Sequence, residues 1–502
     1  MTDRDASDDR RTESWTGGFS RRHVLAGTTA VGASALVGSG LGAASTGANA
    51  EHCFEPFGDD PTATWEISDA RQIELTEDNT APVIEELTDI APNLWVWDYW
   101  PLREMDGSVA CIDGWNVIFA LTSPDALLPG KRHDVAEIRY FYSRDGQDWQ
   151  LGGPIFEPNR ALGNRQWASS AVVDSETREV YFYYTAVGDQ ENVEDTYPPV
   201  EGGITYEQRI ALAHGAKVVA SDSGIDFERR WDHEILLTAD GEYYQTMDQA
   251  GDGIVYAFRD PWFFMDEDTG CKYLVWEANT PVDPENTPCE TQNLDQGDYL
   301  SGVAAEGAQY NGNIAIAVSK DGSMTDWELA PPLLDATCVN QQLERGNIVK
   351  MNNRYYLFAI SHKFTFAPGI DGPDGLYGWV ADSIHGDYEP LNGTGLVLAN
   401  PSEAPFQAYS WIPVPYDDED KVALLSYYNY HDLGEKTLKD VGDFSEDRQR
   451  EVFGGTLAPT IVISIDGTET SFVEELPAGY VPSECSDLDG NDGDDGGSDD
   501  GN

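Results

Sequence analysis

Three acidic residues of this chain stand in surroundings that do not explain a charged side chain. Asp98 lies among three tryptophans and one tyrosine in residues 94–101. Asp260 precedes the bulky apolar run 261–264, and Glu344 precedes a segment with the pattern of a strand. A charge among apolar residues is costly unless it is paired or used, so these carboxyl groups are candidates for chemistry.

Paired carboxyl groups in an aromatic setting indicate chemistry on glycosidic bonds. Glycosyl transfer through a covalent intermediate needs a carboxylate nucleophile and a protonated carboxylic acid about 5 to 5.5 Å away. Indole rings also suit the apolar faces of sugars, which favours a carbohydrate pocket around Asp98. Each acid has a plainer interpretation: Asp98 could face solvent from an edge strand, and Asp260 and Glu344 could pair with the adjacent Arg259 and Arg345.

The elements that must position these acids are short strands. Residues 62–475 contain no long stretch of helical period, but many β-branched and aromatic runs bounded by Gly, Asp, Asn and Pro. We therefore predict an all-β domain. The predicted strands include residues 138–142, 180–184, 273–276, 314–318, 355–360, 422–428 and 460–465.

A repeated turn suggests how these strands are arranged. Four segments place a Ser near an Asp and a Gly, with an aromatic residue soon after; they begin at Ser143, Ser221, Ser319 and Ser464. Asp-Gly is a tight-turn signal, so each copy has the features of a hairpin at the outer edge of a propeller blade. A propeller is favoured, and a β-sandwich or jelly roll is the alternative.

Taken together, these segments resemble the levansucrase and inulosucrase family, glycoside hydrolases that transfer fructosyl units from sucrose. The resemblance spans residues 91–476. Trp97-Asp98-x-Trp100-Pro101 is similar to the nucleophile segment of the family, Arg259-Asp260-Pro261 to its transition-state stabiliser and Glu344-Arg345 to its acid/base segment, in the same order. The fold that this implies is a five-bladed β-propeller with a central funnel-shaped active-site pocket.

The resemblance also implies a role for each acid. Asp98 attacks the anomeric carbon of the fructosyl unit while Glu344 protonates the bridging oxygen, and glucose leaves. Glu344 then acts as base on a fructan hydroxyl or water, while Asp260 steadies the fructosyl ring. Burial and nearby negative charge should keep Glu344 protonated, with Asp98 ionised. The expected sugar-binding residues are Trp97, Trp167, Arg259, Gln342, His362 and Tyr409.

Some positions depart from the family pattern. Ala168 stands where a serine often supports the nucleophile, and Tyr99 replaces a common serine. His362 and Gln342 stand where many members have Arg and Glu. At the frequent calcium site of the family, Ile254 and Gln341 fall where Asp is usual. Calcium needs several hard oxygen donors, so we expect neither calcium nor another cofactor.

Several functions are compatible with these acids. A fructosyltransferase that makes levan is favoured, and an inulosucrase or a hydrolase of sucrose or fructan is the alternative. Linkage depends on how the acceptor lies at the rim of the pocket, which the sequence does not reveal. A sugar-binding propeller without catalysis is disfavoured, because all three acids are present.

The charge of the chain restricts its partners. The 90 acidic residues against 30 basic ones give a formal net charge of -60, which would repel nucleic acid and anionic membranes. At molar salt the Debye length shrinks to about 3 Å, which would screen the self-repulsion. We therefore expect a salt-adapted, haloarchaeal-type enzyme that works as a monomer on sucrose and fructan acceptors.

The two ends of the chain indicate export. Ser20-Arg21-Arg22 precedes an Ala- and Gly-rich apolar run that stops at Ala48-Asn49-Ala50, as in a twin-arginine signal peptide of residues 1–50. An uncleaved anchor is the alternative. The expected catalytic domain is 51–482, followed by a disordered acidic tail at 483–502. Six cysteines permit disulfides, and their spacings match no zinc pattern. We expect some of them to remain free thiols.

Overall fold

The computed structural model describes residues 50–57, 62–85, 87, 89–158, 160–188, 206–228, 230–250, 256–282, 309–416 and 420–487. The predicted signal peptide, apart from Ala50, and the acidic tail beyond Asp487 lie outside these ranges. The described helices are short, the longest being a 3-10 helix of eight residues, η1. They are η1 (Ala50–Phe57), α1 (Ile67–Ala70), η2 (Pro129–Val135), η3 (Lys363–Thr365), η4 (Leu391–Gly393), η5 (Leu438–Asp443), α3 (Glu446–Val452) and α4 (Glu484–Asp487).

Five antiparallel strand units follow one another along the chain. The first contains β2 (Leu94–Arg103), β3 (Asn116–Pro124), β4 (Glu137–Ser143) and β5 (Gln150–Pro154). The second contains β6 (Arg165–Val173), β7 (Glu179–Val187), β8 (Gln208–Ser221), β9 (Gly224–Glu228) and β10 (Asp232–Leu237). The third contains β11 (Phe258–Asp266), β12 (Cys271–Asn279), β13 (Gly312–Ser319) and β14 (Trp327–Asp335), with β1 (Ala63–Thr64) added parallel to β14.

The remaining two units complete the set. The fourth contains β15 (Glu344–Met351), β16 (Arg354–Ser361), β17 (Gly375–Ala381), β18 (Glu389–Pro390) and β19 (Leu396–Ala399). The fifth contains β20 (Ala408–Pro415), β21 (Lys421–Tyr430), β22 (Phe453–Leu457), β23 (Pro459–Asp466) and β24 (Glu469–Ala478). These units are the five blades of a β-propeller, so the predicted fold class is confirmed.

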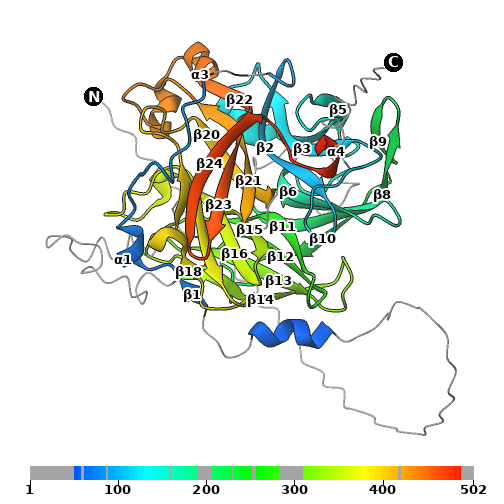
Figure 1. The fold of residues 1–502 in the computed structure, drawn as a ribbon, viewed down its shortest axis with the longest axis horizontal. Coiled ribbons are helices and arrows are strands. Elements are labelled where there is room, and N and C mark those ends of the chain that lie inside the picture. The colour runs from blue at the N-terminus through cyan, green and yellow to red at the C-terminus, as the bar shows by residue number, and fades with distance from the viewer. Residues whose placement is uncertain are drawn as a thin grey trace, which may run out of the picture. The chain divides into compact units, whose positions relative to one another are not determined.

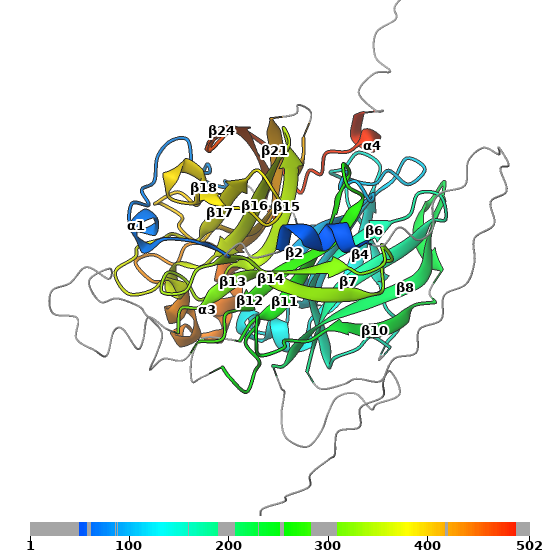
Figure 2. The same ribbon diagram turned by 90° about the horizontal axis from the view of Figure 1, so that it is seen from below.

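The blades form a ring through their first strands. β2 pairs in parallel with β6, β6 packs against β11, β11 against β15 and β15 against β20, while β2 also contacts β21 and β22 of the fifth blade. Figure 1 shows β2, β6, β11 and β15 near the centre, with later strands such as β5, β8, β14 and β18 farther out, and Figure 2 gives the view turned by 90°. A closed ring leaves no long open sheet edge at the centre, which is where the site lies.

All seven strands predicted by residue range occur in the structure, as parts of β4, β7, β12, β13, β16, β21 and β23. The four repeated turns are also hairpins between neighbouring strands. They connect β4 to β5, β8 to β9, β13 to β14 and β23 to β24. The turn chemistry therefore predicted local pairing correctly.

Two disulfides attach the ends of the described chain to the propeller. Cys53 of η1 is bonded to Cys271 at the start of β12, and Cys111 is bonded to Cys485 of α4. Cys338 is disulfide-bonded as well. The expectation of free thiols is wrong for the described cysteines. The expected tail boundary at Ser483 also needs correction, because Cys485 is 3% exposed and covalently part of the fold.

Candidate active site

The first strand of every blade is interrupted by a shift of register. Such a β-bulge leaves residues out of the ladder and turns their side chains in a new direction. The shifts fall at Trp97/Tyr99, Trp167/Ser169, Arg259/Trp262, Glu344/Asn347 and Tyr409/Ile412. Each blade thus presents one irregular point toward the central pocket.

The backbone at these bulges is unusual for residues with a side chain. The φ angles of Asp98, Asp260, Arg345 and Ser410 are 43°, 63°, 53° and 66°. Positive φ is uncommon outside glycine and concentrates at functional sites, where the surrounding structure maintains it. The bulges therefore give a structural reason why these four side chains converge from four different blades.

A cavity of about 320 Å³ lies where the bulges meet, and Asp98, Asp260 and Glu344 all line it. These acids lie together as the sequence predicts, although 246 positions separate the first from the last by number. Five of the six expected sugar-binding residues also line the cavity, and these are Trp167, Arg259, Gln342, His362 and Tyr409.

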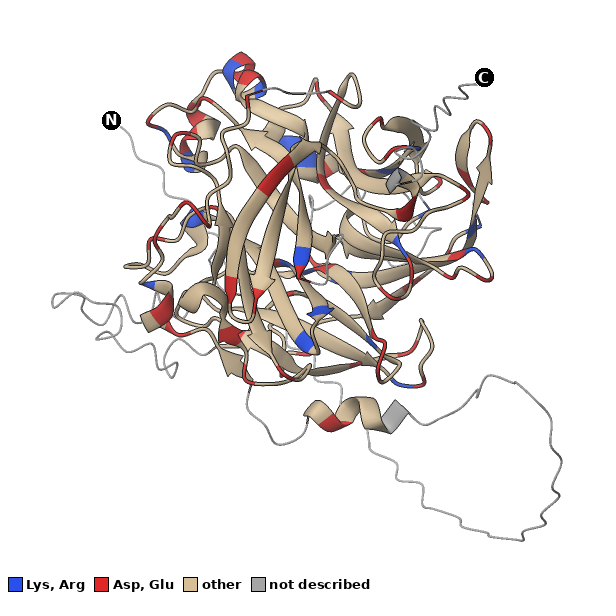
Figure 3. Cartoon of the chain, in the orientation of Figure 1, with Lys and Arg blue, Asp and Glu red and all other residues tan. Residues whose placement is uncertain are grey.

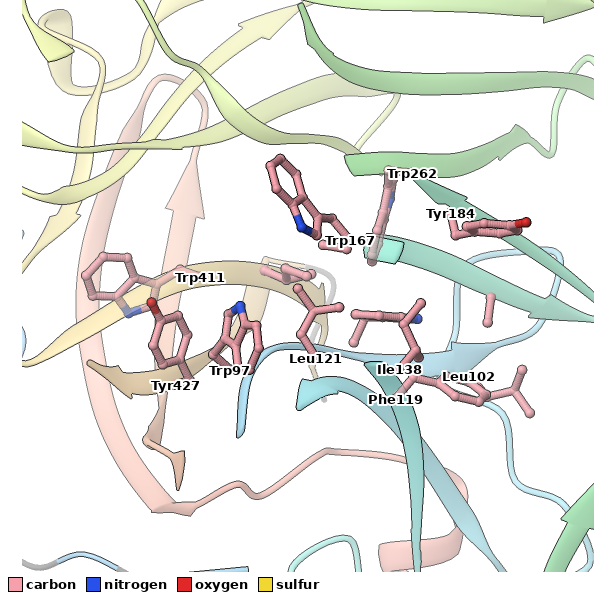
Figure 4. Close-up of a cluster of buried hydrophobic side chains, with 14 of the residues drawn as sticks. Trp97, Leu102, Phe119, Leu121, Ile138, Trp167, Tyr184, Trp262, Trp411 and Tyr427 are labelled. Atoms are coloured by element: carbon pink, nitrogen blue, oxygen red, sulfur yellow. The ribbon is translucent and has the colours of Figure 1, made fainter. Parts of the chain in front are cut away.

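Trp97 is the expected residue that does not line the cavity. Its side chain is 0% exposed, and its ring centroid lies 5.5 Å from that of His133, which does line the cavity. Figure 4 shows Trp97 beside Tyr427 and within the same aromatic cluster as Trp167 and Trp411. Trp97 therefore supports the wall of the pocket from behind.

Asp98 is surrounded by groups that oppose the effect of its burial. The Arg345 guanidinium donates from Nη1 to the Ser410 hydroxyl at 2.6 Å and from Nη2 to the Tyr99 carbonyl at 3.3 Å. Burial raises the pKa of Asp98, while the charge of Arg345 and a hydrogen bond with Ser410 lower it. These two partners favour the carboxylate that a nucleophile requires, but the net pKa lies above its ordinary value.

Asp260 is held by its backbone as well as by its side chain. Its N–H donates to the Thr185 hydroxyl at 2.8 Å, and its Oδ2 lies 3.7 Å from Arg259 Nε. Burial raises the pKa of Asp260 to about 7, with Arg259 acting in the opposite direction and Asp98 adding to the rise. Asp260 is thus the carboxyl group of the site that carries the clearest cost of burial.

Glu344 accepts hydrogen bonds from two neighbours. Arg259 Nη2 donates to its Oε1 at 2.9 Å, and the Tyr409 hydroxyl donates to its Oε2 at 2.5 Å. Burial raises the pKa of Glu344, but Arg259, His362 and the Tyr409 hydrogen bond together bring it below its ordinary value. This corrects the expectation that burial and negative charge keep Glu344 protonated; in the sugar-free pocket the donors favour its carboxylate.

His362 belongs to a stack of rings beside Glu344. Its Nδ1 lies 2.7 Å from Oδ2 of the buried Asp374. Its ring lies 3.8 Å from that of Tyr409 and 4.9 Å from that of Phe364, nearly parallel to both. Burial lowers the pKa of His362, but Asp374 and Glu344 raise it by more than burial lowers it. The net pKa is therefore above its ordinary value, and an imidazolium is favoured.

Several cavity residues were missed by the sequence analysis. η2 contributes Arg132, His133 and Asp134, and Tyr206 comes from just before β8 in the second blade. The signal for η2 was available, because Lys131-Arg132-His133 is a basic cluster in a strongly acidic chain, directly after Pro129-Gly130. Tyr206 carries no such local signal, since its place depends on how the first two blades meet.

Ala168 and Tyr99 stand where a serine is common in the family, and the structure shows what each of them contacts. Tyr99 is buried in a different hydrophobic cluster, away from the cavity lining. Ala168 offers no hydroxyl, but its carbonyl accepts a hydrogen bond from Thr185 at 3.2 Å, and Ser410 supplies a hydroxyl to Asp98 from the fifth blade. The hydroxyl partner of the nucleophile candidate therefore comes from another strand.

The residues described around Gln341 are neutral amides rather than the carboxylate usual at this position of the family. Gln341 is buried, and Asn279 donates its Nδ2 to the Gln341 carbonyl at 2.9 Å, so the setting is rich in amides. Ile254 lies outside the described residues. In the described part of the chain, the candidate metal group is His52, Cys53 and Cys271, whose two sulfurs are bonded to each other. The lack of calcium stays a prediction.

Comparison with known proteins agrees with this geometry. The model of glycoside hydrolase family 68, described as levansucrase/invertase, matches residues 57–482. The chain belongs to this family. A levansucrase from Pseudomonas syringae pv. actinidiae is 33% identical over 444 residues, covering 84% of this chain and 93% of the relative. An extracellular sucrase from Zymomonas mobilis is 31% identical, covering 78% of this chain and 87% of the relative.

A solved structure is more similar in sequence. An inulosucrase from Halalkalicoccus jeotgali bound to kestose is 48% identical, with a TM-score of 0.77, over 84% of this chain and 98% of that structure. As a member of the levansucrase/invertase family, this chain is an enzyme that acts on sucrose as a fructosyltransferase. None of the described helices is long and apolar enough to cross a membrane.

Proposed function

We propose that the enzyme transfers fructosyl units with retention, through a covalent intermediate on Asp98. Asp98 attacks the anomeric carbon of the fructosyl unit of sucrose while Glu344 protonates the bridging oxygen, so that the bond between that carbon and the bridging oxygen breaks and glucose leaves. Glu344 then removes the proton from an acceptor hydroxyl, which displaces Asp98 from the fructosyl unit. The observation that carries this proposal is that Asp98, Asp260 and Glu344 line one cavity and that each has a different set of partners.

Each of the three carboxyl groups has a role that its neighbours support. Arg345 and Ser410 favour the ionised nucleophile, and Asp260 faces the same cavity with a carboxyl group that can accept sugar hydroxyls. The Tyr409 hydroxyl and Arg259 both donate hydrogen bonds to Glu344. These donors can stabilise its carboxylate after it has given up its proton. A single chain supplies all of these residues, so we propose that a monomer is sufficient.

The linkage of the product follows from the acceptor side of the pocket. The 48% identity to the Halalkalicoccus jeotgali inulosucrase favours inulin-type linkage over the levan expected from the sequence. The levansucrase relatives at 33% identity support levan as the second candidate. We therefore propose inulin-type transfer, with levan as the outcome that would contradict it.

The test is incubation of the protein with sucrose in concentrated salt. Free glucose and free fructose are measured over time, and the product linkage is determined by NMR. A transferase releases more glucose than fructose, because part of the fructose enters the product. Equal release of the two sugars would identify a plain hydrolase, which uses the same acids with water as acceptor.

We also propose that the enzyme works outside the cell after twin-arginine export. The paired arginines at Arg21 and Arg22 precede an apolar run, and disulfides such as Cys53–Cys271 suit an oxidising compartment. Expression of the full chain in a salt-adapted archaeal host, with Arg21 and Arg22 changed to lysine, tests this. The variant should remain inside the cells, and secretion of both forms would exclude the route.

A further inference from the structure

Glu277 is a buried carboxyl group that touches the site without lining its cavity. It lies on β12, and the strand register places it directly opposite Arg259 of β11. Its side chain is 0% exposed, and in the described part of the chain Arg259 is its one cationic partner. A fully buried carboxyl group with one cation beside it is stable as a carboxylate only while that cation pairs with it. Its protonation state therefore depends strongly on the other groups that the cation binds.

Arg259 is shared between Glu277 and the acid/base candidate. Its Nη2 donates to Glu277 Oε1 at 3.0 Å and to Glu344 Oε1 at 2.9 Å, so both carboxyl groups use the same nitrogen. Its Nε lies 3.0 Å from the second oxygen of Glu277 and 3.7 Å from Asp260. The single charge of Arg259 therefore faces three carboxyl groups and cannot neutralise all of them in a buried place. Arg345 also acts on Asp260 and His362 on Glu344, whereas Glu277 has Arg259 alone among the described residues.

We infer that Glu277 is a positioning residue for Glu344, and that the two carboxyl groups share one proton, with Arg259 paired to whichever of them is ionised. This inference rests on the proposed role of Glu344 as acid and base. In the sugar-free pocket the proton is on Glu277 and Glu344 is paired with Arg259. When Glu344 carries the proton for sucrose cleavage, Glu277 is ionised and takes Arg259.

The proton balance closes over one catalytic cycle. Protonated Glu344 gives its proton to the glucosyl oxygen, and Glu344 regains a proton from the acceptor hydroxyl. The directions of the pKa values agree: burial raises the pKa of Glu277 well above its ordinary range, and Arg259 with its other partners lowers that of Glu344. In a coupled pair such as this, loss of one partner changes the titration of the other.

Other charged groups also face this pair. From the surrounding strands these are Arg259 and Asp260 of β11, Asp98 of β2, Arg345 of β15, His362 after β16 and Tyr409 of β20. All of them remain in a Glu277→Gln variant. A change in the titration of Glu344 in that variant is therefore assigned to Glu277 itself.

The first measurement is the pH dependence of kcat/KM for glucose release. In Glu277→Gln, Arg259 has only Glu344 and Asp260 to pair with, so the pKa of Glu344 falls and the alkaline limb moves down by about one pH unit. Activity at neutral pH then falls about tenfold. Glu277→Asp keeps a carboxyl group at this position. The alkaline limb of its pH profile should therefore stay near that of the native enzyme, even if its kcat/KM is lower.

A matched control removes a buried acid of the neighbouring strand, β11. Asp266 is 2% exposed and pairs with Lys350 at 2.5 Å at the far end of the strand. Asp266→Asn should lower the melting temperature without moving the alkaline limb. If Glu277→Gln also lowers only the melting temperature, or if Glu277→Asp moves the limb as far, Glu277 is merely structural and the inference is overturned.

A second measurement needs no sugar. Infrared titration is done on a protein that already carries Asp98→Asn and Asp260→Asn, because burial also raises the pKa of these two carboxyl groups of the site. It should reveal a carboxyl band that persists above the pH where exposed carboxyl groups ionise. This band should titrate at lower pH in both Glu277→Gln and Glu344→Gln, because each remaining partner then has Arg259 to itself. A band that either substitution leaves unchanged overturns the shared proton, even if the protein does not cleave sucrose and the proposed function fails.

Discussion

At the scale of single residues, Asp98 shows how burial and neighbours act against each other. Burial raises its pKa, whereas Arg345 and Ser410 hold its carboxylate in the form that can attack a carbon. Both partners come from other strands than Asp98 itself, which lies on β2. The nucleophile candidate is thus prepared by the meeting of three blades.

Replacing Asp98 by Asn should abolish glucose release from sucrose, by about four orders of magnitude or more, because an amide cannot form the glycosyl ester. The measurement is initial-rate glucose release, with circular dichroism to check the fold. Asp106→Asn, an exposed acid just after β2, is the matched control. Substantial activity in Asp98→Asn would remove Asp98 from its role.

Asp260 should make stability depend on pH. Its pKa is raised by burial to about 7 in the folded protein, above the ordinary value, so the folded state binds the extra proton. Stability from this group is therefore present at low pH and lost as pH rises toward 7. Asp260→Asn should stabilise the protein above that pH by on the order of 1 to 3 kcal/mol, while sucrose cleavage is lost.

Thermal unfolding of both proteins from about pH 5 to 8 tests the sign. The native protein should approach the variant in melting temperature as the pH falls. If the variant is less stable at every pH, then Asp260 contributes a favourable interaction in the folded state, and burial of its charge is not the dominant effect.

At the scale of elements, the strands and hairpins were predictable but the bulges were not. Asp-Gly turns and alternating apolar residues act locally, so the hairpin from β4 to β5 follows from its own sequence. The positive φ of Asp98 or Arg345 depends on partners from other blades, which no local pattern contains. Because local sequence does not show which way a side chain turns at a bulge, it predicts Trp97 as a cavity residue. In the structure Trp97 is buried behind the residues that line the cavity.

η2 and Tyr206, just before β8 of the second blade, lie at the rim of the pocket. Tyr206 is 42% exposed, lines the cavity and donates its hydroxyl to Asp134 at 3.2 Å. Arg165 lies 4.9 Å from its ring centroid, and the Trp167 ring lies 6.4 Å away. An exposed ring held in place beside the catalytic pocket suits the apolar face of an acceptor sugar.

Tyr206→Ala should therefore lower the ratio of transferred to free fructose, by about threefold to tenfold, because stacking on an aromatic face is lost. The readouts are the glucose-to-fructose ratio and the length of the products. Tyr243→Ala is the control, since Tyr243 is similarly exposed and does not line the cavity. An unchanged ratio in Tyr206→Ala would place acceptor binding on another side of the rim.

At the scale of the whole molecule, charge is the dominant feature of the surface. Figure 3 shows far more Asp and Glu than Lys and Arg, many of them in the loops between strands. The formal net charge of -60 belongs to the full chain and includes its acidic end. Self-repulsion of this size opposes the folded state unless ions screen it.

The protein should lose cooperative unfolding and melt at lower temperature as salt is removed. The test is thermal unfolding in molar potassium chloride and in dilute buffer, with sorbitol at equal osmolality as the control. Sorbitol stabilises by exclusion from the surface but does not screen charge. An equal melting temperature in dilute buffer and in salt would contradict the salt adaptation inferred from composition.

The disulfide between Cys111 and Cys485 has a consequence for how the molecule is assembled. Its cysteines are 374 residues apart in sequence, and the segment between β24 and Cys485 crosses from the fifth blade to the first. On the way, Trp149 donates to the Gly479 carbonyl at 2.8 Å, and Val481 donates to the Gly146 carbonyl at 2.9 Å. In the folded protein the two sulfurs meet where the end of the last blade reaches the first. Formation of this disulfide therefore reports closure of the ring of blades. Trapping of the free Cys485 thiol at successive times during refolding would measure when closure occurs.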